Sequence, residues 1–262
     1  MSALMLRTAA TLLMLLDHIG YASGDTVLRM FGRLSFPIFA FLLANGFRHT
    51  RSVQRYALRL FAFAVISEIP YDLYFGNGIC YASWVGLLPE LRLDNIYFTL
   101  LIGLLFLWLR QVYKKHLPHI ARLCSLVTLL VLSCFAQYIG ADYGAVGIFW
   151  VALFGVCNGE EPRNAVQLCI GSAVLASWRV FCKMVLGHLG VEITNPVLSV
   201  FLPCGALTFI DHVQPYAALA IFFIFLYNGK SGMPSSRIAR RTLQYAFYAF
   251  YPLHILIFWL VT

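Results

Sequence analysis

The sequence predicts an all-α, polytopic integral membrane protein, a helical bundle of about nine to ten transmembrane helices. Hydrophobic residues make up 61% of the 262 residues and charged residues only 11%, which is about half the charged share of an ordinary soluble domain. The connections between apolar runs are short, so residues 1–262 are expected to form a single transmembrane domain. The apolar runs fall near 4–22, 28–47, 56–75, 95–113, 120–138, 143–157, 166–186, 194–210, 215–228 and 242–261.

The basic residues predict how these helices are oriented. Twelve of the 19 lie in three connecting segments, a distribution typical of cytoplasmic loops rather than of a nucleic-acid-binding surface. We therefore expect a multi-pass protein of the plasma (inner) membrane with a cytoplasmic N-terminus. The three segments contain Arg48, Arg51, Arg55 and Arg59; Arg110, Lys114, Lys115 and Arg122; and Lys230, Arg237, Arg240 and Arg241.

Ten full crossings would place the third basic segment outside the cell. If one apolar run does not cross the membrane, the third basic segment lies in the cytoplasm with the other two. The run that contains Pro196 and Pro203 is the best candidate for such a run. Backbone breaks at membrane depth usually line a cavity. We expect this run to be broken or re-entrant, which leaves about nine crossings and one partial element. Asp211 and His212 follow it in a short connection and are expected to be solvated.

Polar residues inside the apolar runs define two expected layers. Arg7 and His18 are eleven residues apart in the first run, so a helix presents both on one face, about 16 Å apart. Arg7 lies near the cytoplasmic side together with the arginines that follow the second run. Sorting by depth places a second group in the outer half of the bilayer: Asp17, His18, Arg33, Glu68, Asp72 and, if the last helix starts inside, His254.

This layering has a chemical interpretation. Guanidinium groups match phosphate oxygens, and a histidine deeper in the same cavity can act as a general base near neutral pH. A long donor with phosphates at one end, such as an acyl-coenzyme A, would span both layers. Structural alternatives remain open at each residue. His18 could be a satisfied core histidine, Arg33 could be ion-paired with Asp17, Glu68 or Asp72, and the arginines could only determine topology.

Five short motifs resemble the TraX family, the membrane proteins named for acetylation of conjugative pilin. They are Asp17-His18-Ile19-Gly20, the run from Gly32 to Phe41, Ser67-Glu68-Ile69-Pro70-Tyr71-Asp72, Asn95-Ile96-Tyr97-Phe98-Thr99-Leu100 and Tyr251-Pro252-Leu253-His254. The Arg7-x10-His18 spacing also resembles the first-helix signature of acyltransferase-3 membrane enzymes. There the histidine is taken to be catalytic and acetyl-coenzyme A to be the donor.

The resemblance implies a membrane acyltransferase that moves an acetyl or acyl group from cytoplasmic acetyl-coenzyme A to a hydroxyl or amine. The acceptor could be a pilin N-terminus, a glycan or another envelope or small molecule. A proton-coupled transporter is the alternative, because intramembrane acids and histidines also build proton relays. No metal is expected. The candidate catalytic residues are Asp17, His18, Arg33, Glu68 and Asp72, the candidate donor-binding residues are Arg7, Arg48, Arg51, Arg55 and Arg59, and Tyr251 and His254 are further candidates.

Overall fold

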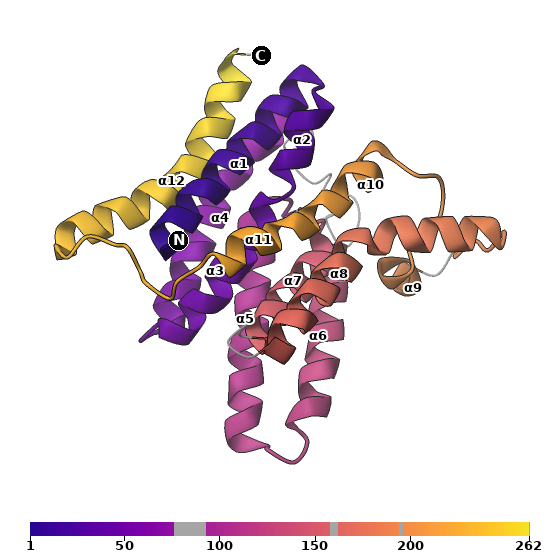
Figure 1. Cartoon of the computed structure of the whole chain (residues 1–262), viewed down its shortest axis with the longest axis horizontal. Coiled ribbons are helices and arrows are strands. Elements are labelled where there is room, and N and C mark those ends of the chain that lie inside the picture. The colour runs from indigo at the N-terminus through magenta and orange to yellow at the C-terminus, as the bar shows by residue number, and fades with distance from the viewer. Residues whose placement is uncertain (76–92, 158–161, 194–195, 262) are drawn as a thin grey trace, which may run out of the picture. The chain divides into compact units, whose positions relative to one another are not determined.

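The structure is a computed structural model that describes residues 1–75, 93–157, 162–193 and 196–261 (Figure 1). All regular secondary structure in these ranges is helical. The elements are α1 (Ala3–Ser23), α2 (Thr26–Gly32), α3 (Ser35–His49), α4 (Val53–Phe75), α5 (Ile96–His116), α6 (Ala121–Tyr138), α7 (Gly144–Val156), α8 (Pro162–His188), α9 (Pro196–Phe201), α10 (Phe209–Val213), the 3-10 helix η1 (Gln214–Leu219), α11 (Ala220–Phe225) and α12 (Arg237–Val261).

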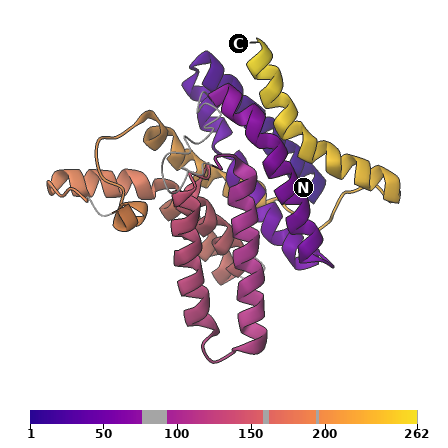
Figure 2. The ribbon, with the colours of Figure 1, turned by 180° about the vertical axis from the view of Figure 1, so that it is seen from behind.

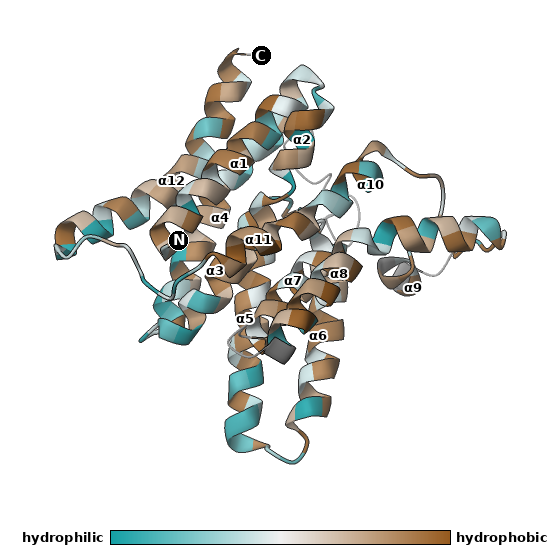
Figure 3. Cartoon of the chain, viewed as in Figure 1, coloured by the Kyte–Doolittle hydropathy of each residue, from teal (hydrophilic) through white to brown (hydrophobic). Residues whose placement is uncertain are grey.

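Six helical segments among the described residues are long and apolar enough to cross a membrane. Figure 3 shows the apolar colouring that covers most of the long helices. The all-α membrane class is confirmed, whereas the expected count of nine to ten crossings is not. The predicted helix at 56–75 exists as α4, but its charged residues, among them Arg59, Glu68 and Asp72, keep it out of this set. The six segments are Ala3–Ser23, Thr26–His49, Ile96–His116, Ala121–Tyr138, Asn164–His188 and Arg237–Val261.

The contacts within the chain group into two compact units, which are described separately below. Unit 1 comprises Met1–Asn45 and Phe149–Gly232, and unit 2 comprises Gly46–Ile148 and Met233–Thr262. Two of the three boundaries fall inside α3 and α7, and the third falls in the connection between α11 and α12. The expectation of a single domain over 1–262 stays a prediction.

The first turn of α1 in unit 1 is anchored through its backbone. The first four amide groups of a helix have no partner within the helix. Here Ala3 and Leu4 donate to the carbonyls of Lys230 and Ser231 at 2.8 and 3.0 Å. Met5 donates to the Ser2 hydroxyl at 3.3 Å, and the amide of Leu6 reaches the Ser2 carbonyl at 3.0 Å. The start of α1 and Lys230 therefore lie at the same end of unit 1. This agrees with the sequence analysis, which expects both the N-terminus and the third basic segment on the cytoplasmic side.

The apolar run at 194–210 is broken, as expected from its prolines. Its described part holds the short helix α9 and the beginning of α10, and Gly205 between them has a φ of 94°, which only glycine adopts at no steric cost. The next run, expected as one helix over 215–228, is divided into η1 and α11. Whether this part re-enters the membrane stays a prediction.

Unit 2 is built on two helix pairs. The helices α5 and α6 form a hairpin, and they lie side by side in both views of the ribbon (Figures 1 and 2). The hydroxyls of Tyr113 and Thr128 meet across it at 3.1 Å. The helices α4 and α12 form the other pair, and α5 packs on α4. The start of α5 is fixed by Asn95, whose amide group donates to the carbonyl of Ala64 at 2.8 Å.

A proline in α12 explains one side-chain contact in unit 2. Pro252 has no amide hydrogen, so the carbonyl of Tyr248, four residues earlier, loses its helical partner. The hydroxyl of Tyr97 donates to that carbonyl at 2.9 Å. We expect Tyr97→Phe to destabilise the protein by about 1 to 2 kcal/mol, because it leaves a buried carbonyl unsatisfied. The midpoint of thermal unfolding in detergent measures this. Tyr245→Phe is the control, since the side chain of Tyr245 is exposed; equal shifts for both variants would contradict the assignment.

Candidate functional site

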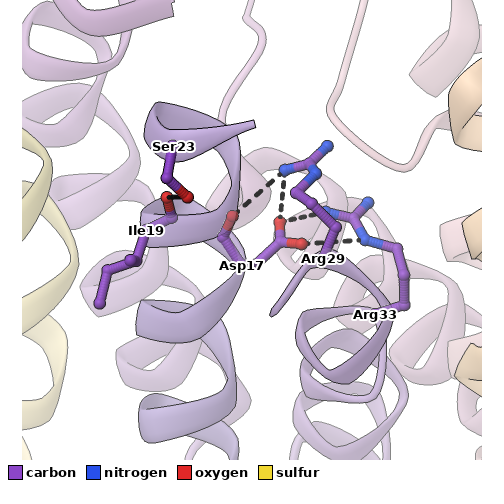
Figure 4. A network of polar contacts seen from close by, with 5 residues as sticks. All are labelled: Asp17, Ile19, Ser23, Arg29 and Arg33. Atoms are coloured by element: carbon purple, nitrogen blue, oxygen red, sulfur yellow. Dashed lines mark hydrogen bonds and ion pairs between the residues drawn. The ribbon is translucent and has the colours of Figure 1, made fainter. Parts of the chain in front are cut away.

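The most extensive buried ion-pair contact of the N-terminal region links α1 to α2. The carboxylate of Asp17 on α1 accepts from Arg29 Nη1 at 3.0 Å and from Arg33 Nε at 3.2 Å, and Arg33 Nη2 binds the second oxygen (Figure 4). Arg29 also reaches the Asp17 carbonyl at 3.4 Å. All three side chains are at least nine-tenths buried. We call Asp17, Arg29 and Arg33 the ion-pair cluster.

The turn between the two helices positions this cluster. The helix α1 ends at Gly24, whose φ of 71° lies in the left-handed region, a standard helix C-terminus. The next residue, Asp25, caps α2 by accepting from the amides of Val27 and Leu28 at 2.7 and 3.2 Å. The hydroxyl of Ser23 donates to the Ile19 carbonyl at 2.9 Å and closes the last turn of α1 (Figure 4). The chain therefore folds back so that α2 packs on the end of α1.

Gly32 allows the close approach of the two helices at the cluster. A Cβ atom on Gly32 would lie 2.6 Å from the Cα of Asp17 and would overlap its side chain. We expect Gly32→Ala to push α2 away from α1 and to lower the free energy of unfolding by about 1 to 3 kcal/mol. Thermal unfolding in detergent measures the change. The matched control is Gly187→Ala in α8, where no atom lies within 4 Å of the added Cβ and a gain of up to about 1 kcal/mol is expected. A Gly32→Ala protein as stable as the unmodified chain would show that the contact is not needed.

The cluster shows a partner of Arg33. Of the three acids considered from the sequence, Asp17 forms an ion pair with it. The second arginine, Arg29, was missed by the sequence reasoning. It precedes Arg33 by four residues, a spacing that puts two side chains on one face of a helix, and this spacing was the available signal. A direct catalytic role for Asp17 or Arg33 stays a prediction.

His18 lies immediately after Asp17, inside the first apolar helix. Its side chain is buried, with 8% of the residue exposed, so it is not turned out toward lipid. Arg7 lies eleven residues earlier on the same unbroken helix and is half-buried. The hydroxyl of Thr11 donates to the Arg7 carbonyl at 2.9 Å. Arg7 and His18 therefore lie on one continuous helix, as predicted. In the sequence, His18 directly follows Asp17 of the ion-pair cluster.

The remaining predicted residues belong to unit 2. Glu68 accepts from the amide of Asp94 at 3.1 Å and from the side chain of Asn95, so it holds the start of α5. Asp72 follows it by one turn and is half-buried. In α12, His254 is buried, and its Nδ1 contacts the Phe250 carbonyl at 2.8 Å. Tyr251 is also buried, and its ring meets the ring of Tyr97 edge-on at 5.2 Å.

Four of the five arginines predicted to bind the donor lie where α3 ends and α4 begins. Arg48, Arg51 and Arg55 are exposed. Arg59 stacks over the ring of Tyr56 at 5.6 Å. Its Nε is buried and has no hydrogen-bond partner among the described residues. Three exposed guanidinium groups, together with the buried N–H of Arg59 that has no partner among the described residues, fit the chemistry of a phosphate-bearing ligand.

A second buried ion-pair group in unit 1 corrects one expectation. Asp211, expected to be solvated, is fully buried and binds Lys183 at 2.8 Å and Arg179 at 3.0 Å, whereas His212 is exposed as expected. Thr208 donates to the same carboxylate through its amide and its hydroxyl. Burial alone would raise the pKa of Asp211, but these hydrogen bonds hold that pKa below its ordinary value. The missed signal was the spacing of four between Arg179 and Lys183 on α8.

No three His, Cys, Asp or Glu side chains in the described part of the chain gather as a metal site would require. The absence of a metal nevertheless stays a prediction.

These observations define the class of protein. The part of the chain that the structure describes has six helical segments long and apolar enough to cross a membrane, and the first of them contains the buried acid of the ion-pair cluster. This combination is typical of a multi-pass membrane protein with charged groups fixed inside its helices. The model of the TraX protein family matches residues 2–262. The probable fimbrial assembly protein FimC, serogroup H1, of Dichelobacter nodosus is 30% identical over 275 residues, which cover 97% of this chain and 93% of that protein.

The chain therefore belongs to the TraX family, and the family recognised from its motifs is confirmed. No solved structure matches it. The further likeness to acyltransferase-3 enzymes stays a prediction.

Proposed function

We propose that this chain is an integral-membrane acyltransferase that moves an acetyl or acyl group from cytoplasmic acetyl-coenzyme A to a hydroxyl or amine of an acceptor. The observation that carries the proposal is the buried imidazole of His18, next in sequence to an acid that two buried arginines hold in place. An imidazole is the side chain best suited to accept and return a proton near neutral pH. Family membership supports the same activity.

In this proposal His18 is the general base. It accepts the proton of the acceptor hydroxyl or amine as the acceptor oxygen or nitrogen bonds to the acyl carbon. It then returns that proton to the thiolate sulfur that leaves when the carbon–sulfur bond breaks. The Asp17 carboxylate fixes α1 against α2 and is a positioning residue. The guanidinium of Arg33 would stabilise the negative charge that develops on the acyl oxygen.

The donor would be held by arginines. Arg59 and Arg55, four residues apart on one face of α4, would bind phosphate oxygens through their guanidinium forks. Arg48 and Arg51 precede them and would add charge. Arg7, on α1 in unit 1, is proposed as a further phosphate contact.

Glu68 and Asp72 stay proposed catalytic residues, although the contacts of Glu68 with Asp94 and Asn95 already give it a structural role. Tyr251 and His254 stay candidates as well. The relative from Dichelobacter nodosus is named a fimbrial assembly protein, which suggests a pilin-type protein as acceptor, beside a glycan or a small molecule. The proposed location is the inner membrane, with the N-terminus in the cytoplasm.

Binding of coenzyme A tests the donor assignment. A ligand that binds only the folded state stabilises it by about 2.7 kcal/mol at a hundred times its Kd. We expect coenzyme A to raise the unfolding midpoint of the purified chain, pantetheine to do so far less, and Arg59→Gln to reduce the effect. Arg122→Gln, in a different basic segment, is the matched control. If coenzyme A gives no stabilisation at millimolar concentration, the donor assignment fails and the proton-coupled transporter becomes the better hypothesis.

A further inference from the structure

Unit 2 contains an apolar groove between α4, α5 and α6 that the proposed acyl transfer does not use. Its volume is about 440 Å³, within the range of ligand sites. Apart from Gln54, every side chain that lines it is aliphatic or aromatic. Each of the three helices contributes to the wall: Ala57 and Phe61 on α4, Leu105 and Trp108 on α5, and Phe135 on α6, with Ile139 directly after that helix.

The groove has the length of one lipid chain. Its lining on α5 runs from Phe98 to Trp108, ten residues that rise about 15 Å along the helix. The hydrocarbon core of a bilayer is about 30 Å thick, so one leaflet is about half of that. Several lining side chains, including Phe61, Trp108 and Phe135, are also substantially exposed. A single acyl chain therefore fits the groove in length and in chemistry.

One end of the groove is basic. The helices α4 and α5 run antiparallel, because Asn95 at the start of α5 binds Ala64 while Trp108, near the end of α5, shares the groove with Val53 at the start of α4. Lys115 follows Trp108 by seven residues, two helical turns or about 10 Å further on the same face. Figure 3 shows this end of α5 as hydrophilic.

No acidic residue lies on the part of α4 that lines the groove or on α5 or α6, and the acids of α4, Glu68 and Asp72, follow the last lining residue of that helix, Phe61. The sequence contains no Asp or Glu over 46–67 or over 96–138, which includes the first part of α4 and all of α5 and α6. Lys115 is exposed, and so is Gln54, which contributes only its aliphatic part to the lining and keeps its amide group outside it. An apolar slot that ends at an uncompensated ammonium group is complementary to a lipid with a negative headgroup.

We propose that this groove binds one acyl chain of an anionic phospholipid, with the headgroup phosphate at Lys115 and Gln54. The basic end belongs to the segment that the positive-inside distribution assigns to the cytoplasm. The cytoplasmic leaflet is the one that carries anionic lipid. The occupant is therefore a lipid of that leaflet.

Photo-crosslinking tests the proposal on the full chain in nanodiscs. The probes are phosphatidylglycerol and phosphatidylcholine that carry the same diazirine-labelled acyl chain, at matched concentrations. We expect phosphatidylglycerol to label peptides that contain 53–61 and 98–108 about fivefold more than phosphatidylcholine does, the effect of one basic residue near the surface. Lys115→Gln should remove this preference and leave the labelled peptides unchanged.

A second test fills the groove with a larger side chain. Ala57→Trp should lower phosphatidylglycerol labelling at least about fivefold, whereas Leu58→Trp, on an exposed neighbour that does not line the groove, should leave it unchanged. Leu105→Trp repeats the test on α5 if Ala57→Trp does not fold. Equal labelling by the two lipids, undiminished labelling of both groove variants, or full competition by soluble glycerol phosphate would each overturn the proposal.

Discussion

Replacing His18 with alanine should lower acyl transfer by about 10²- to 10⁴-fold, the usual contribution of a positioned general base. The reason is that the neighbouring carboxylate, Asp17, is held in ion pairs with Arg29 and Arg33, which leaves the imidazole as the better proton acceptor at that place in the helix. Release of free coenzyme A thiol, measured with membranes that contain the acceptor, gives the rate. The fall should appear in kcat, because His18 acts on the reacting proton and not on the phosphates of the donor.

A matched control makes this result specific. His212 lies in the same unit and is exposed, so His212→Ala should keep the full rate. Coenzyme A should still stabilise the His18→Ala protein against heat, which separates lost chemistry from lost folding. Turnover retained by a correctly inserted His18→Ala protein would reject the catalytic assignment.

Replacing Asp17 with asparagine should destabilise the protein by about 3 to 5 kcal/mol, because it removes the negative charge that two buried guanidinium groups bind. Both Arg29 and Arg33 are only 8% exposed, so water cannot take over this role. Thermal unfolding in detergent measures the loss. Asp25→Asn is the control: Asp25 is exposed and acts as a helix cap, and asparagine caps about as well as aspartate.

A combined variant shows whether the ion pairs themselves stabilise the protein or only avoid the cost of unpaired buried charge. Replacing Asp17 by leucine and both Arg29 and Arg33 by methionine should restore most of the stability lost in Asp17→Asn, since removing all the charges of a buried group is often neutral or stabilising. A combined variant that is less stable than Asp17→Asn would show that the cluster contributes favourable energy beyond the avoidance of unpaired charge.

The long helices were predictable from the sequence because their apolar runs are continuous. The runs at 4–22, 95–113 and 120–138 correspond closely to α1, α5 and α6. The break between α2 and α3 was not predicted, because the residues from Thr26 to His49 stay apolar through it. The division of 215–228 into η1 and α11 was also missed, although Pro215 stands in the first turn of η1.

The candidate site was predictable in part for a related reason. Depth sorting placed Asp17 and Arg33 in the same layer, and they are paired. The same reasoning could not choose among Asp17, Glu68 and Asp72, because it gives depth but not the direction in which a side chain points around the bundle. The sequence reasoning also missed the burial of Asp211, because a residue in a short connection is usually exposed to solvent. In the structure, Thr208, Arg179 and Lys183 donate hydrogen bonds to the Asp211 carboxylate and take the place of water.

The position of the ion-pair cluster also bears on how the chain enters the bilayer. An aspartate adds about 3 kcal/mol to the apparent cost of insertion at the centre of a helix and less nearer its end, where Asp17 lies. The partners of Asp17 follow it by twelve and sixteen residues and arrive on the next segment across one tight turn. The first two spans should therefore leave the translocon together as a helical hairpin with its charges already neutralised, and truncation of the nascent chain before residue 29 should leave the first span poorly inserted.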